Sequence, residues 1–166
     1  SVNYGQGKYW KNNNSLNVNY RVGKFNFFAN AGTSEWNGFQ KLTIHREFLD
    51  GSTKTTKAIF DQVSHMRNIS NYYNLKVGAD YYVNKNTTLG IVTSGFSNPG
   101  KYSSINTSYL KNNSGKVDSI AYAESMNKNN WKNGSVNLNF RHQFDSLGKE
   151  LTSDVDYVSY RSSNNQ

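Results

Sequence analysis

Hydrophobic and polar residues alternate with period two along most of the chain, which is the pattern of half-buried β-strands. Helix signals are nearly absent. Over residues 15–22 the two kinds of residue take turns, with Leu16, Val18, Tyr20 and Val22 set against Asn17, Asn19 and Arg21. The alternation resumes at Phe25 after Gly23-Lys24. This Gly-X pair predicts a two-residue hairpin, because glycine supplies the positive φ of a II′ turn.

The same arrangement recurs around residues 84 and 145, so tight turns follow one another at even intervals. Two polar breaks, 50–54 and 112–116, fall near the middle of those intervals. We therefore predict an all-β fold, an antiparallel up-and-down meander of about six long strands with the tight turns at one end and the longer polar loops at the other. The four inner strands are expected at 25–48, 57–83, 87–111 and 117–143.

Strands of this length far exceed the usual 5–6 residues of globular sheets. A tilted strand needs only about 9–11 residues to cross a bilayer, so the excess would project beyond the membrane as a hairpin wall. A rival segmentation cuts the chain at the turn signals 33–38 and 98–100 and gives about eight to ten ordinary strands, as in a soluble sandwich or barrel. A bulge within a long strand can absorb either break. The even spacing of the turns favours the long strands, since it has no reason to exist in the rival.

Composition narrows the classes of protein. The 166 residues fit a single region, 1–166, and the mean hydropathy of -0.81 with no long apolar run excludes a membrane-spanning helix. The absence of cysteine excludes disulfides, thiolate metal sites and cysteine nucleophiles. An aromatic content of 14% argues against disorder, even with 26 asparagines. The net charge of +8 predicts an anionic neighbour, either nucleic acid or a phosphate-bearing lipid surface.

Three stretches carry a family resemblance: LNVNYRVGKFNF at 16–27, VGADYYVNKNTTLG at 77–90 and NLNFRHQFD at 137–145. Together and in this order they resemble the outer-membrane β-barrels of TonB-dependent receptors, common in Bacteroidetes-type bacteria. The resemblance covers about residues 13–160 and rests on turn and strand texture. Such receptors have a signal peptide, an N-terminal plug and a 22-stranded barrel.

The chain departs from that plan because it shows no plug-like segment, no leader and no closing aromatic residue. We therefore expect an interior piece of the barrel, with no plug domain, since single-chain barrels start at eight strands. The resemblance implies a Gram-negative outer-membrane location and a non-enzymatic part in the energised uptake of a bulky solute. Its implied partners are outer-membrane lipid and lipopolysaccharide, the rest of the barrel with its plug, and the TonB system through the parent protein.

No motif predicts catalysis, a cofactor or a metal site. His45, His65 and His142 show no ligand spacing and are interpreted as solvated or lumen-facing side chains. Three strand carboxylates, Asp80, Asp154 and Asp156, are expected to face a watery lumen and to pair with Lys76 or Arg141. The glycosylation sequences at Asn68, Asn86 and Asn106 are expected by chance in so asparagine-rich a chain.

Aromatic and basic residues complete the expectations. Aromatic side chains near the tight turns are predicted to form the periplasmic girdle of a barrel: Tyr20, Phe25, Phe27, Tyr81, Tyr82, Phe140, Phe144 and Tyr157. Four lysines are placed at the outer loops, where they keep the loops solvated or meet lipopolysaccharide phosphates: Lys54, Lys57, Lys111 and Lys116. The lysines are otherwise scattered, so nucleic acid is not an expected partner. The alternative to the barrel is a soluble secreted β-sandwich that binds glycans through Trp36, Trp131 and nearby asparagines, or a surface adhesin.

Overall fold

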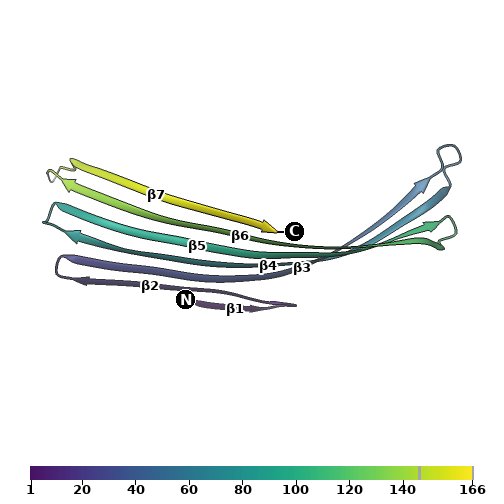
Figure 1. Cartoon of the computed structure of the whole chain (residues 1–166), viewed down its shortest axis with the longest axis horizontal. Coiled ribbons are helices and arrows are strands. Elements are labelled where there is room, and N and C mark those ends of the chain that lie inside the picture. Colours follow the sequence, from purple (N-terminus) through teal and green to yellow (C-terminus); the bar gives the residue numbers. More distant parts are fainter. Residues whose placement is uncertain (146, 166) are drawn as a thin grey trace. The chain divides into compact units, whose positions relative to one another are not determined.

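The computed structural model describes residues 1–145 and 147–165 and contains one seven-stranded antiparallel sheet in the order β1-β2-β3-β4-β5-β6-β7. Each strand lies beside its neighbours in the sequence, so the sheet is an up-and-down meander (Figure 1). The strands are β1 (Val2–Gln6), β2 (Trp10–Val22), β3 (Phe25–Leu49), β4 (Thr56–Tyr82), β5 (Thr87–Asn112), β6 (Val117–Gln143) and β7 (Glu150–Asn165).

The predicted all-β meander is confirmed, and the four inner strands begin and end within a residue or so of their expected bounds. The segmentation into short strands is wrong, because β3 runs through 33–38 and β5 runs through 98–100. The short strand β1 was not predicted. It pairs with Trp10–Asn14 of β2, and five residues containing one glycine are too few to show a clear alternation.

The three tight turns lie at one end of the sheet, as the spacing predicted. The turn at Gly23-Lys24 joins the directly paired residues Val22 and Phe25, and Gly23 has a φ of 55°. Its Lys24 carbonyl accepts a hydrogen bond of 2.8 Å from the amide of Tyr82, beside the second turn. The carbonyl of Asn86 in that second turn accepts one of 2.8 Å from Gln143, beside the third. Ser146 of the third turn and Gln166 lie outside the described residues.

A short polar side chain organises four of the connections. Asp50, Asn84, Asn112 and Asp145 each accept a hydrogen bond on Oδ1 from the backbone N–H two residues further on. This local bond replaces the strand ladder and is the reason that Asp and Asn are favoured in turns. The two polar breaks predicted at 50–54 and 112–116 are therefore turns, with positive φ at Lys54 and Gly115.

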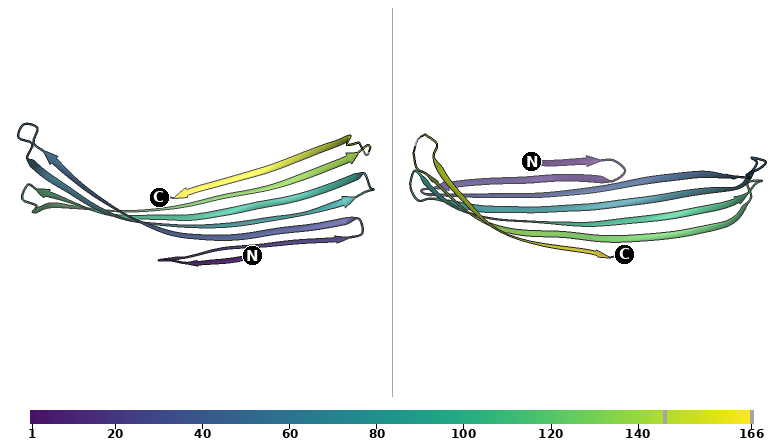
Figure 2. Two further views of the ribbon diagram at one scale, coloured as in Figure 1. Left: turned by 180° about the vertical axis from the view of Figure 1, so that it is seen from behind. Right: turned by 90° about the horizontal axis from the view of Figure 1, so that it is seen from above.

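Two compact units divide the long strands. The first contains Ser1–Trp36, Ser70–Pro99 and Asn129–Ser163, and the second contains Asn37–Ile69, Gly100–Lys128 and the last residues from Asn164. Within each unit the strands lie side by side in one layer (Figure 2). No hydrophobic side chain of the described residues is buried, and the buried ones are Asn37, Ser64 and Ser104. No helix in the described part of the chain is long and apolar enough to cross a membrane.

Candidate functional site

One face of the first unit is apolar. The register of β2 and β3 places Leu16 opposite Ala31, Val18 opposite Ala29, Tyr20 opposite Phe27 and Val22 opposite Phe25. Directly opposite residues of an antiparallel pair share a face, so these side chains form one surface. The surface continues over the next strands, where Phe25 contacts Tyr81 and a hollow is lined by Ala79, Leu89, Ile91 and Leu138. Leu138 is 52% exposed, and nothing in the described residues covers this face.

The other face of the first unit carries side-chain amides that bond to one another, both across and along the strands. Asn74 Nδ2 donates to Asn30 Oδ1 at 3.3 Å, and Asn30 Nδ2 donates to Asn17 Oδ1. Further along the sheet, Asn139 donates to Asn137 at 3.2 Å and Asn137 donates to Asp156 at 2.9 Å. An amide both donates and accepts, so asparagines can be linked in chains of this kind, and the carboxylate of Asp156 is the last acceptor of the second chain. We call this surface the polar face of the first unit.

Three glycines on the polar face accommodate large side chains from a neighbouring strand. A Cβ at Gly78 would overlap the ring of Phe28, and a Cβ at Gly32 or Gly90 would overlap the amide of Asn74 or Asn139. Glycine inside a strand commonly marks such a close approach. These pairs fix the register of β3 against β4 and of β5 against β6.

The predicted aromatic girdle is divided between the two faces. Phe25 stacks on Phe27 with ring centroids 5.9 Å apart and contacts Tyr81 at 4.8 Å, on the apolar face. Tyr82 instead lies on the polar face, because the Arg21 guanidinium sits 4.6 Å from its ring centroid. Tyr82 is therefore not part of an apolar girdle. Its position follows from period-two alternation, which separates Tyr81 from Tyr82 although both rings lie near the turn.

A second group of aromatic side chains crosses the polar face further from the turns. The ring of Tyr72 on β4 lies 5.7 Å from that of Phe96 on β5, and Phe96 lies 6.3 Å from Trp131 on β6. We call Tyr72, Phe96 and Trp131 the aromatic row. Tyr72 lies two residues before Asn74 of the amide chain and therefore on the same face. Phe96 likewise shares a face with Ser94, whose hydroxyl bonds to that of Ser135 at 2.8 Å.

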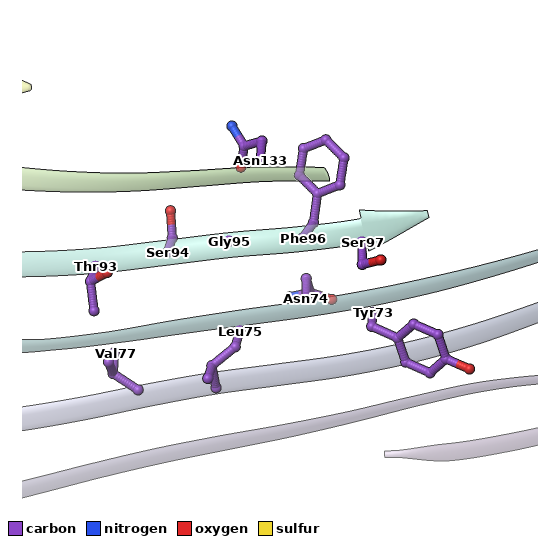
Figure 3. Close-up of a pocket in the computed structure, with 10 residues that line it drawn as sticks. All are labelled: Tyr73, Asn74, Leu75, Val77, Thr93, Ser94, Gly95, Phe96, Ser97 and Asn133. Atoms are coloured by element: carbon purple, nitrogen blue, oxygen red, sulfur yellow. The ribbon is translucent and has the colours of Figure 1, made fainter. Parts of the chain in front are cut away.

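A depression of about 430 Å³ opens on the opposite, apolar face of the same strands, where β5 lacks a side chain at Gly95 and the lining includes Leu75, Val77 and Thr93. Figure 3 shows Ser94 and Phe96 projecting to one side of β5 and Thr93 and Ser97 projecting to the other. A Cβ at Gly95 would lie 2.9 Å from the carbonyl oxygen of Asn133, so the close approach of β5 and β6 requires glycine here.

In the second unit, charged side chains form a network across three strands. His45 Nδ1 lies 2.6 Å from Asp61 Oδ1, and Lys111 Nζ lies 2.6 Å from Asp61 Oδ2. His45 Nε2 also lies 3.4 Å from Glu47, which accepts a hydrogen bond from Thr56. The bonds to Asp61 and Glu47 raise the pKa of His45. Those from Lys111 and His45 lower the pKa of Asp61.

Asn37, Ser64 and Ser104, the buried residues, lie in the second unit, and each has a hydrogen-bond partner. Asn37 Oδ1 accepts from Arg67 at 3.3 Å, and the hydroxyl oxygens of Ser64 and Ser104 accept from Gln62 at 2.9 Å and Asn106 at 3.0 Å. Burial of a polar group is tolerated only with such a partner. These hydrogen bonds offset the cost of burying the three polar side chains.

The other ionisable candidates are placed as follows. His142 Nδ1 lies 2.9 Å from Thr87 Oγ1, and its ring contacts Phe144. Asp80 accepts a hydrogen bond from Asn26, while Asp154 and Asp156 accept from Asn137. The pairing expected with Lys76 or Arg141 is not found among the described residues, because Arg141 binds Glu150 at the start of β7, at 2.8 Å, and Lys76 forms no ion pair with these aspartates. Among the described residues, no group of three His, Asp or Glu side chains is arranged to hold a metal ion.

The lysines expected at the outer loops differ in their surroundings. Lys54 and Lys116 lie in the two turns, and Lys57 approaches Asp50 at 3.7 Å. Lys111 lies on β5 and is held by Asp61, so it is a strand residue of the network.

No family model and no curated protein matches the chain.

Sequence reasoning missed the aromatic row and the network around Asp61. Tyr72 and Trp131 are 59 positions apart in the numbering, and only the register of β4, β5 and β6 brings them into line. The sequence could have placed each ring on the polar face, because each lies two residues from a polar residue of that face, as Tyr72 does from Asn74. The His45–Asp61 pair could have been found in the same way, by pairing strands across the 50–55 turn.

Proposed function

We propose that this chain forms part of the wall of an outer-membrane β-barrel of the TonB-dependent receptor type, which takes up a bulky solute. The single observation that carries the proposal is the pair of unlike faces on a one-layer sheet. One face exposes leucine, valine, isoleucine and phenylalanine side chains, and the other carries bonded amides and charges. A transmembrane barrel wall has this composition, with apolar residues toward lipid and polar residues toward the lumen.

The length of the apolar stretch agrees with a membrane crossing. The apolar alternation extends over residues 75–83, from Leu75 in β4 to Val83 directly after the strand. A tilted transmembrane strand needs about 9–11 residues. The second unit, with the charged network at Asp61, lies outside these stretches of β3, β4 and β5 and would be in water.

The sheet without a covering layer supports lipid as the neighbour of the apolar face. An exposed apolar surface of this extent in water is an association site. A soluble sandwich needs a second packed layer, and the described residues form one layer in each unit. The sheet has open edges, at β1 and the part of β2 beyond its pairing with β1 on one side and at β7 on the other, and such edges favour a wall that pairs with further strands. The receptor class itself rests on the resemblance of 16–27, 77–90 and 137–145.

The experiment compares two adjacent residues of β6. The chain has no cysteine, so Leu138→Cys and Asn139→Cys each provide one site for an environment-sensitive fluorophore. The labelled variants are refolded into phosphatidylcholine liposomes, with and without lipids that carry a quencher on the acyl chain. We expect a blue-shifted, quenched label at position 138 and a water-exposed, unquenched label at 139.

Equal quenching at the two positions would contradict the assignment of the faces. A chain that stays monomeric and cooperatively folded at high concentration in water would contradict the membrane proposal itself. Sedimentation in buffer without detergent provides that second measurement.

A further inference from the structure

The aromatic row is the feature of the polar face that neither membrane anchoring nor packing explains. Its rings come from three adjacent strands and contact one another in succession, and the described residues form no second layer over them. Trp131 is 53% exposed. Aromatic anchors of a membrane barrel face lipid, whereas these rings share a face with Asn74 and Ser94. An exposed apolar patch with a polar rim marks a binding site.

The rim of the row is polar and uncharged in its immediate surroundings. Asn98, opposite Trp131 in the sheet, accepts a hydrogen bond from Ser70 at 3.1 Å, and Ser94 bonds to Ser135 at 2.8 Å. The amide of Asn133, two residues from Trp131, has no hydrogen-bond partner among the described residues and so offers both a donor and an acceptor.

A ligand for this surface needs apolar ring faces and a periphery of hydroxyl groups. Sugar rings have this chemistry, because their C–H faces lie against aromatic rings while their hydroxyls bond to amides and serine hydroxyls. A nucleic acid would also stack, but it requires a basic groove along its phosphates, and the row contains no lysine or arginine. Three rings in line fit a ligand of several linked units.

We propose that the aromatic row is a binding site for a neutral oligosaccharide, with Trp131 as its most exposed stacking platform and Asn133 as a hydrogen-bonding partner. This inference rests on the proposed function, which places the polar face toward the lumen and so makes the row part of the uptake path. Trp36 does not belong to the site, because the Lys11 ammonium lies 3.4 Å from its ring centroid and occupies one face.

Tryptophan fluorescence tests the site. The chain contains three tryptophans, and Trp10→Phe with Trp36→Phe leaves Trp131 as the only reporter. The protein in detergent micelles is titrated with maltoheptaose and, separately, with cellohexaose. We expect a saturable change with at least one of the two. Affinity for that sugar should fall at least tenfold in Phe96→Ala and several-fold in Asn133→Ala.

Trp131→Ala, followed by calorimetry, should abolish the binding. The matched control is Trp10→Ala, which removes a tryptophan from β2 on the side of Leu16 and should bind as the unchanged protein does. Far-UV circular dichroism establishes that each variant is folded, and Trp131→Phe, which keeps an aromatic ring, should retain part of the affinity.

Absence of binding by both sugars, or equal binding by Trp131→Ala and the unchanged protein, would overturn the proposal. Binding of a nucleoside in place of both sugars would overturn it as well. These outcomes are independent of the lipid-quenching result at 138 and 139, so a failure of the sugar site and a failure of the barrel proposal are distinguishable.

Discussion

Adding a methyl group at Gly78 tests whether the glycine sites set the packing between strands. An ideal Cβ at this position would overlap the tip of the Phe28 ring and would lie 2.9 Å from the Ile91 carbonyl oxygen. The Phe28 ring belongs to β3 and can rotate away. The carbonyl belongs to β5 and is held in the strand, so the sheet itself must shift.

The expected magnitude is the difference between two effects. Replacing glycine by alanine in a compatible backbone conformation stabilises by about 0.4–1 kcal/mol, because the unfolded chain loses freedom. Overpacking of a fitted contact costs about 1–3 kcal/mol. Gly78→Ala should therefore destabilise the protein by about 1–2 kcal/mol. At Gly134 an added Cβ meets nothing within 4 Å, so Gly134→Ala should be neutral or stabilising.

Urea denaturation in detergent micelles, followed by far-UV circular dichroism, measures both variants. The two midpoints should move in opposite directions. Phe28→Ala combined with Gly78→Ala should recover part of the loss, since the ring is one of the two obstacles. Midpoint shifts of the same sign and size at Gly78 and Gly134 would refute the argument, because the contact with Phe28 and Ile91 would then have no energetic effect.

Three further outcomes are expected. Leu138→Arg should cost about 2–4 kcal/mol if the residue lies near the bilayer midplane, whereas Thr152→Arg on the polar face should cost little, as measured by denaturation of both variants in liposomes. The pKa of His45, followed by NMR titration, should lie above its ordinary value and should fall in Asp61→Asn but not in Asp118→Asn. Because this pKa is raised in the folded state, the contribution of His45 to the free energy of unfolding is full below about pH 6.5. It is lost as the pH rises through the folded-state pKa. Limited proteolysis should cut at 50–55 and 113–116 before it cuts within 75–83, and earlier cuts inside β4 would contradict the strand assignment.

The strands could be predicted from sequence because alternation and turn chemistry agree along the whole chain. Gly23, Asn84 and Asp145 mark the tight turns with residues that the turn geometry requires, and the strands then follow by subtraction. The turn signals at 33–38 and 98–100 wrongly suggested strand ends. They mark the positions where the chain passes from one compact unit to the other. Pro99 has no backbone N–H to donate, yet β5 continues through it.

The contacts between side chains could not be predicted to the same extent, because they depend on register. A shift of the register between β3 and β4 by one residue would move every side chain of the shifted strand to the other face of the sheet. The contact of Arg141 with Glu150 and that of His45 with Asp61 require the register of each hairpin, which no single strand contains. The aromatic row requires the registers of two hairpins at once.

The meander also has a consequence for how such a protein can grow and change. Every strand pairs only with its neighbours in the sequence, so no strand must cross over another to find its partner. The entropy cost of loop closure therefore arises at each short turn, and the two strands of the hairpin can then pair residue by residue from the turn. A gene duplication that copied one hairpin would insert two strands between existing neighbours and leave the remaining pairings intact. An architecture of this kind changes its width in steps of one hairpin, and the residues on either face can evolve without a change in the pairing of the strands.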